Sequence, residues 1–129
     1  MRNLDTLAAQ TAQQIIAVTM GFKASEVDNL ATKALGVLQE NGVYAAALFL
    51  YSRSGPDAKI APFVRSQLLG LAAQEVVKHP VPPDKAQEAL SFITDHIAND
   101  LDTLLLVKQV WEQTLTYMRY GAKTREDKQ

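Results

Sequence analysis

The middle of the chain holds a nine-residue run that is apolar on nearly every side: Val43-Tyr44-Ala45-Ala46-Ala47-Leu48-Phe49-Leu50-Tyr51. A run this short is also compatible with a strand, but its alanines favour a short helix. A helix that has no polar face must be surrounded by other elements. The run therefore predicts a helix buried in the middle of a larger helical structure.

Signals that end helices stand on both sides of this run. Asn41-Gly42 comes directly before it, and we expect a preceding helix to end there. The segment that follows it, residues 52–57, contains two serines, a glycine and a proline, which together predict a turn or loop.

Toward the N-terminus, apolar residues recur at the spacing of a helix and almost never alternate as in a strand. One amphipathic helix is expected from Leu4 to about Gly21. A second helix is expected before Asn41. Ser25 is its predicted N-cap, because Asp28 follows three residues later in a loose capping box.

Toward the C-terminus, an apolar stripe predicts a fourth helix that runs to His79. The connector Pro80-Val81-Pro82-Pro83 cannot continue a helix. A fifth helix follows, and it is interrupted near Asp100, where Asp100 or Asp102 is expected to cap the last helix. That last helix is expected to end at about Ala122.

These segments predict an all-α fold, a single-domain bundle of about six helices over residues 1–122. Residues 123–129 are all polar or charged and are expected to form a disordered tail. A chain of 129 residues is long enough to bury a core without disulfides or metals.

Composition excludes several classes of protein. The chain has no cysteine, which removes disulfides, thiolate zinc sites and thiol catalysis and fits a reducing compartment. No secretory signal or membrane-spanning run is visible, so we expect a cytoplasmic protein without membrane contact. A net charge of -1 excludes a strongly polybasic nucleic-acid binder.

No arrangement of residues predicts catalysis. The chain lacks a nucleophile elbow and a glycine-rich phosphate loop. His96 and Asp100 are spaced so that they can share a helix face, but no second histidine stands at a ligand interval, and capping is the more common role of such an aspartate. We therefore expect no enzyme activity, no catalytic residue, no metal site and no cofactor.

Aromatic residues fall into two groups. Trp111 and Tyr44 stand at helical spacing and are expected in the core. Tyr117 and Tyr120 flank Arg119 near the end of the chain, where an aromatic ring beside a cation suits an interface or a nucleic acid.

Charge is segregated along the chain although its total is nearly neutral. Residues 53–78 and 103–129 each carry +2, whereas residues 79–102 carry -4. A single lysine or arginine is ordinarily part of a solvated surface, but together the basic residues of the two positive segments predict contacts with a phosphate backbone. These candidates for phosphate contact are Arg53, Lys59, Arg65, Lys108, Arg119, Lys123 and Arg125.

Two stretches resemble a known family. Residues 38–53, with Asn41-Gly42, the alanine-rich apolar run and then Ser52-Arg53, resemble the fifth, small subunit of the type III-B CRISPR Cmr effector complex. Residues 104–123, with Asp100 ahead of them, are similar to the last helix of that family, although Thr114-Leu115-Thr116 is less basic and less aromatic than usual there. The small subunits of type III-A and type I complexes are neighbouring alternatives.

The resemblance implies a non-catalytic helical subunit, present in several stacked copies beside the subunits that hold the guide RNA. Its implied partners are the backbone and large Cmr subunits, further copies of itself, the guide RNA and the target RNA. By position, Arg53 matches the basic residue after the apolar helix, and Arg119 and Lys123 match basic positions of the last helix. The other four candidates come from the charge distribution alone.

A helical adaptor that binds only protein is a second hypothesis from the residues. The nearly balanced charge and the apolar-rich helices fit it equally well. Crosslinking to RNA separates the two hypotheses, because an adaptor should give no crosslink.

Overall fold

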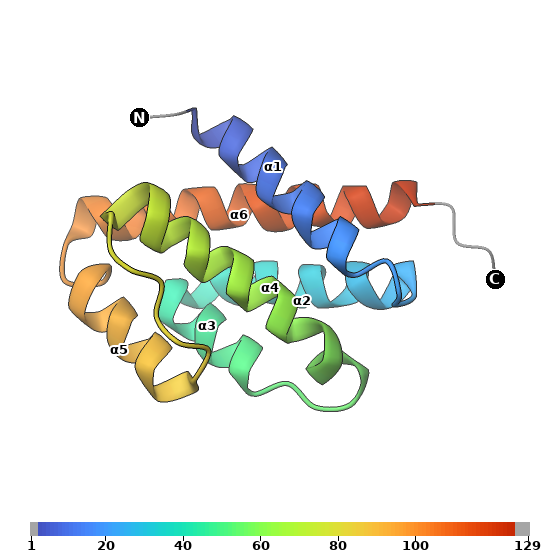
Figure 1. Cartoon of the computed structure of the whole chain (residues 1–129), viewed down its shortest axis with the longest axis horizontal. Coiled ribbons are helices and arrows are strands. Elements are labelled where there is room, and N and C mark those ends of the chain that lie inside the picture. Colours follow the sequence, from blue (N-terminus) through green and yellow to red (C-terminus); the bar gives the residue numbers. More distant parts are fainter. Residues whose placement is uncertain (1–2, 126–129) are drawn as a thin grey trace.

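The structure is a computed structural model that describes residues 3–125. Within that range the chain forms six α-helices and a π-helical segment, η1, and no strand, so the predicted all-α single-domain bundle is confirmed (Figure 1). The elements are α1 (Leu4–Val18), α2 (Ala24–Asn41), α3 (Val43–Tyr51), α4 (Pro56–Leu71), η1 (Ala72–Val77), α5 (Ala86–His96) and α6 (Leu101–Thr124).

The longest helix, α6, spans the bundle and carries much of its core. It packs mainly against α1 and α2, and Figure 1 shows α1 crossing it while α2 lies beside it. Trp111 of α6 is almost fully buried, as predicted, and its indole N–H donates a hydrogen bond of 2.9 Å to the carbonyl oxygen of Leu68 in α4. A single side chain thus connects α6 to the helix on the other side of the core.

Helix α3 is central but not surrounded. Its buried face, which includes Ala46 and Leu50, packs against its neighbours α2, α4 and α5. Tyr44 and Leu48, one turn apart, are 42% and 47% exposed. The prediction that Tyr44 belongs to the core is therefore wrong, because the neighbouring helices leave one side of α3 uncovered.

Side chains cap two of the helices. Asp100 caps α6, as one of the two predicted candidates, and accepts hydrogen bonds from the Thr103 amide (3.0 Å) and hydroxyl (2.7 Å). The prediction for Ser25 is wrong, since α2 begins at Ala24, before that residue, and no side chain caps its N-terminus. Asn3, which the sequence did not single out, caps α1.

The fourth helix does not continue to His79 as predicted. It widens after Leu71 into the π-helical turn η1, and the chain then leaves the helix at Lys78, whose φ of 56° is left-handed. Pro80 prevents the helix from continuing past this exit, because His79, which precedes it, is disfavoured in the α conformation. The proline connector, residues 78–85, then leads to α5 (Figure 1).

The last helix and its contacts extend beyond Ala122, where the sequence predicts the bundle to end. Lys123 and Thr124 belong to α6, and Arg125 donates hydrogen bonds to the carbonyl oxygens of Thr19, Met20 and Phe22. The predicted start of the tail at residue 123 is therefore too early, because α6 continues to Thr124 and Arg125 attaches its end to the loop between α1 and α2. The rest of the expected tail, residues 126–129, lies outside the described residues. None of the helices in residues 3–125 combines the length and the apolar character needed to cross a membrane.

Candidate nucleic-acid interface

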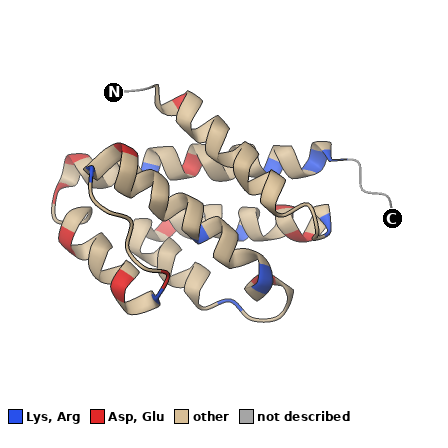
Figure 2. Cartoon of the chain, viewed as in Figure 1, with Lys and Arg blue, Asp and Glu red and all other residues tan. Residues whose placement is uncertain are grey.

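Charged residues are distributed unevenly over the bundle. Figure 2 shows the acidic residues of α5 and of the start of α6 at one end of the molecule, while basic residues gather around the far end of α6. Figure 2 also shows acidic residues at the start of α2 beside the basic end of α6, and basic residues at the two ends of the connector, so the charges are only partly separated in space. A polyanion would be attracted to the second of these regions.

Arg119 and Lys123 form the site at the C-terminal end of α6. They stand one helical turn apart, and both contact Asp28 of α2, with distances of 3.6 Å from Arg119 Nε to Oδ1 and 3.4 Å from Lys123 Nζ to Oδ2. We call Asp28, Arg119 and Lys123 the α2–α6 charge cluster. It has two cations for one carboxylate, so its formal charge is +1.

The α2–α6 charge cluster is loosely held. Both of its ion-pair distances are long, and the Nε–H of Arg119 is buried without a hydrogen-bond partner among the described residues. The Lys123 side chain is 51% exposed. The neighbouring Tyr120 ring is 58% exposed and lies 5.9 Å from the Arg119 guanidinium. Tyr117 differs, since its hydroxyl donates to the Asp5 carboxylate and joins α6 to α1.

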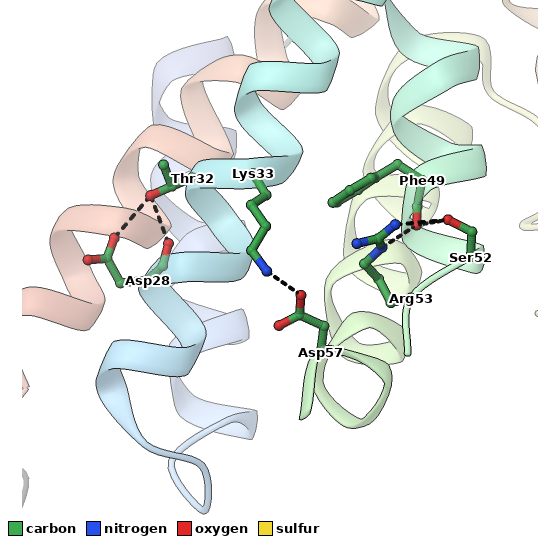
Figure 3. Close-up of polar contacts among 7 residues, drawn as sticks. All are labelled: Asp28, Thr32, Lys33, Phe49, Ser52, Arg53 and Asp57. Atoms are coloured by element: carbon green, nitrogen blue, oxygen red, sulfur yellow. Dashed lines mark hydrogen bonds and ion pairs between the residues drawn. The ribbon is translucent and has the colours of Figure 1, made fainter. Parts of the chain in front are cut away.

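Arg53 lies at the end of α3, where its charge supports the helix. Its guanidinium lies 3.7 Å from the centroid of the Phe49 ring, and its Nε donates to the Phe49 carbonyl oxygen over 3.0 Å (Figure 3). A cation that binds a terminal carbonyl group stabilises the C-terminus of a helix. In the same view Lys33 of α2 pairs with Asp57 of α4 at 2.7 Å.

Arg65 is bound tightly in a second cluster. Its Nε and Nη2 donate to the two oxygens of Asp84 over 2.8 and 3.2 Å, and its guanidinium lies 4.3 Å from the centroid of the Tyr51 ring. The Tyr51 hydroxyl donates to the same carboxylate over 2.8 Å. We call these three residues the connector clasp, because they attach the proline connector to α3 and α4.

The connector clasp shifts two pKa values in opposite directions. The hydrogen bonds from Arg65 lower the pKa of the Asp84 carboxyl, and the hydrogen bond from Tyr51 acts in the same direction. Burial raises the pKa of Tyr51 to about 12, with a further contribution from its hydrogen bond to Asp84. At neutral pH the clasp therefore consists of a carboxylate, a guanidinium and a neutral phenol.

Acid is expected to weaken the connector clasp. The pKa of Asp84 is lowered by folding, so its contribution to stability is present at neutral pH and is lost as the pH falls below about 4 through the folded-state value. Because this carboxylate is half exposed, we expect a contribution of about 0.5 to 1 kcal/mol. Urea unfolding of the wild type and of Asp84→Asn between pH 7 and pH 3 measures it. The two proteins should converge in acid, and a constant difference across this range would contradict the assignment.

The remaining candidates differ in their surroundings. Lys108 pairs with Glu112 one turn away at 3.8 Å. Lys59 is exposed and makes no side-chain ion pair within residues 3–125. Arg125, as described above, binds backbone carbonyl groups. Among the seven predicted residues, a shared partner brings together only Arg119 and Lys123, as far as the structure describes the chain.

Sequence reasoning missed the acidic partners Asp28 and Asp84. Each lies far along the chain from the cation that it contacts, and the pairing exists only because α2 packs on α6 and the connector returns to α4. No local pattern in the sequence signals such a pair.

The described residues contain no group of three or more histidine, aspartate or glutamate side chains placed to hold a metal ion. Asp100 serves as a helix cap, and the centroid of the His96 ring lies 4.0 Å from that of His79. A comparison with models of protein families finds no match to this chain, and neither does a comparison with curated proteins or with solved structures.

Proposed function

We propose that this chain is a non-catalytic, RNA-contacting subunit of a type III-B CRISPR Cmr effector complex, acting in antiviral defence. The observation that carries the proposal is the α2–α6 charge cluster, in which two cations share one carboxylate over long distances. Both cations stand at positions where the chain resembles the last helix of that family. Small subunits of type III-A or type I complexes share the same expected role.

The chemistry of the cluster suits a phosphate group. A phosphate, like a carboxylate, offers several oxygen acceptors to Arg and Lys, and it forms charge-assisted hydrogen bonds with both. The Lys123 ammonium, on a half-exposed side chain, and the part of the Arg119 guanidinium that reaches solvent are donors for such contacts. The exposed Tyr120 ring beside them can stack on a base of a single strand.

One copy of the chain should bind RNA weakly. Two or three phosphate contacts contribute little at physiological salt, because they are screened and compete with counterions. Several copies joined along one RNA bind together through a raised effective concentration. The proposal therefore includes stacked copies of this chain, together with the backbone and large subunits that hold the guide and target RNA in the cytoplasm.

Recovery of a tagged chain from its native host tests this function. We expect the other subunits of one effector complex and a set of small guide RNAs to be recovered with it. Ultraviolet crosslinking of that assembly to target RNA is expected to modify the segment that contains Tyr120. Recovery of the chain without RNA or effector subunits would contradict the proposal.

The helical adaptor is a second candidate, and two observations favour it. Arg65 and Arg125 use their guanidinium groups to hold the fold, which leaves fewer candidates for RNA than the sequence predicts. Leu101 and Leu105 of α6 are 68% and 53% exposed and form an apolar strip one turn long that suits a protein contact. An assembly in which this subunit gives no RNA crosslink would favour the adaptor.

A further inference from the structure

A cleft of about 780 Å³ lies between the proline connector and α5, away from the α2–α6 charge cluster. In Figure 1 the connector passes from the end of α4 and η1 to the start of α5. One wall of the cleft is formed by the connector, from His79 to Pro83, and the opposite wall is one face of α5. The residues of that face are Gln87, Glu88, Ser91, Phe92, Asp95 and His96.

Three rings form an aromatic surface in this cleft. The centroids of His79 and His96 are 4.0 Å apart, and each lies 5.5 Å from the centroid of Phe92. Phe92 is buried and anchors the group, while both imidazole rings belong to exposed residues. The Nδ1 of His79 lies 2.9 Å from the Pro80 carbonyl oxygen, which can only accept, so this nitrogen donates and the ring orientation is fixed.

Two carboxylates flank the rings. Glu88 and Asp95 are seven residues apart on α5, which places them on the same face of the helix with Phe92 between them. Neither forms an ion pair in the part of the chain that the structure describes, whereas Asp28, Asp57 and Asp84 all do. Lys85 is the basic residue among those that line the cleft.

We infer that this cleft receives an arginine side chain from a basic segment of another protein chain. A guanidinium group is planar, so it can stack on an exposed imidazole ring while its N–H groups donate to carboxylates. Lysine offers a compact charge without that planar face and fits less well. Phosphate groups are disfavoured here, because residues 79–102 carry a charge of -4.

The same arrangement already exists inside this fold. In the connector clasp, the Arg65 guanidinium stacks on an aromatic ring and pairs with a carboxylate at the same time. The α5 cleft presents the ring and carboxylate halves of such a site without an arginine. Binding of an arginine in this cleft does not require RNA contact at the α2–α6 charge cluster.

Nuclear magnetic resonance of the full chain tests the site directly, because its two histidines give separate imidazole signals. Substitution of either histidine assigns them. We expect a hexa-arginine peptide to shift both signals and to bind at least threefold more tightly than hexa-lysine. Equal binding of the two peptides would overturn the assignment to arginine, and unchanged histidine signals would overturn the site.

A pair of matched variants separates the cleft from general attraction between charges. Glu88→Gln with Asp95→Asn is expected to weaken hexa-arginine binding about tenfold. Glu26→Gln with Glu40→Gln removes the same charge from α2 and should weaken binding less than twofold. An equal loss in both double variants would show attraction to net charge alone and overturn the inference.

Single-stranded RNA and a second copy of this chain are two other candidate occupants of the cleft, and each is tested. Single-stranded RNA that shifts the histidine signals would overturn the inference in favour of a nucleic acid. Sedimentation of the chain alone tests for a second copy. If the wild type self-associates and Glu88→Gln with Asp95→Asn does not, a second copy occupies the cleft and the assignment to a different chain is wrong. If the wild type and this double variant are both monomers, the assignment is supported.

Discussion

Replacement of Trp111 by alanine is expected to lower the free energy of unfolding by about 3 to 5 kcal/mol. The indole ring is 1% exposed and lies in the core between α6 and α4, so its removal leaves a cavity and also deletes the hydrogen bond to Leu68. Stabilities of small domains are about 5 to 15 kcal/mol, so this loss is a large fraction of the total. Urea unfolding followed by circular dichroism measures it without relying on the fluorescence of the deleted residue.

A phenylalanine at this position separates packing from hydrogen bonding. Trp111→Phe retains most of the apolar volume but has no N–H for the Leu68 carbonyl oxygen, which still accepts the amide of Ala72. We therefore expect a smaller loss of about 1 to 2 kcal/mol. A loss below 1 kcal/mol in Trp111→Ala would contradict the central place of this residue in the core.

The number and approximate bounds of the helices follow from local patterns in the sequence. Apolar spacing locates every α-helix, the proline connector marks the break before α5, and Asp100 is recognisable as a cap. The errors concern features that depend on neighbours. Tyr44 has the spacing of a core residue, yet no helix covers its side of α3. Ser25 has the pattern of a cap, yet α2 starts one residue earlier.

The candidate site is only partly predictable for a related reason. Charge segregation identifies the cations, since lysine and arginine are visible in any sequence. Whether each cation is available depends on tertiary packing, which places Asp84 on Arg65 at 2.8 Å and leaves Arg119 at 3.6 Å from Asp28. The prediction thus treats as equal two arginines that the fold uses differently.

Reversal of charge at the α2–α6 charge cluster is expected to have the largest effect on RNA binding. Arg119→Glu with Lys123→Glu removes two proposed phosphate contacts. It should weaken binding of single-stranded RNA by the assembled complex about tenfold at physiological salt. The slope of log K against log salt concentration should become less steep by about 1.4, since each contact on a single strand contributes about -0.7. Fluorescence anisotropy at several salt concentrations measures both quantities.

The same double variant also places three carboxylates together, which can destabilise the contact between α2 and α6. Adding Asp28→Lys restores an ion pair of reversed direction. This triple variant should recover the thermal stability of the wild type while RNA binding stays weak, because the cluster then has a net charge of -1. The comparison therefore separates a loss of phosphate contacts from a loss of folding.

Asp28→Asn supplies a change in the opposite direction. It removes the carboxylate that competes with phosphate for Arg119 and Lys123, and it is expected to strengthen RNA binding about threefold. Glu40→Gln, which removes one charge elsewhere on α2, should have a smaller effect and controls for net charge. If Asp28→Asn and the double charge reversal both leave RNA binding unchanged, then Arg119 and Lys123 serve the contact between α2 and α6 alone.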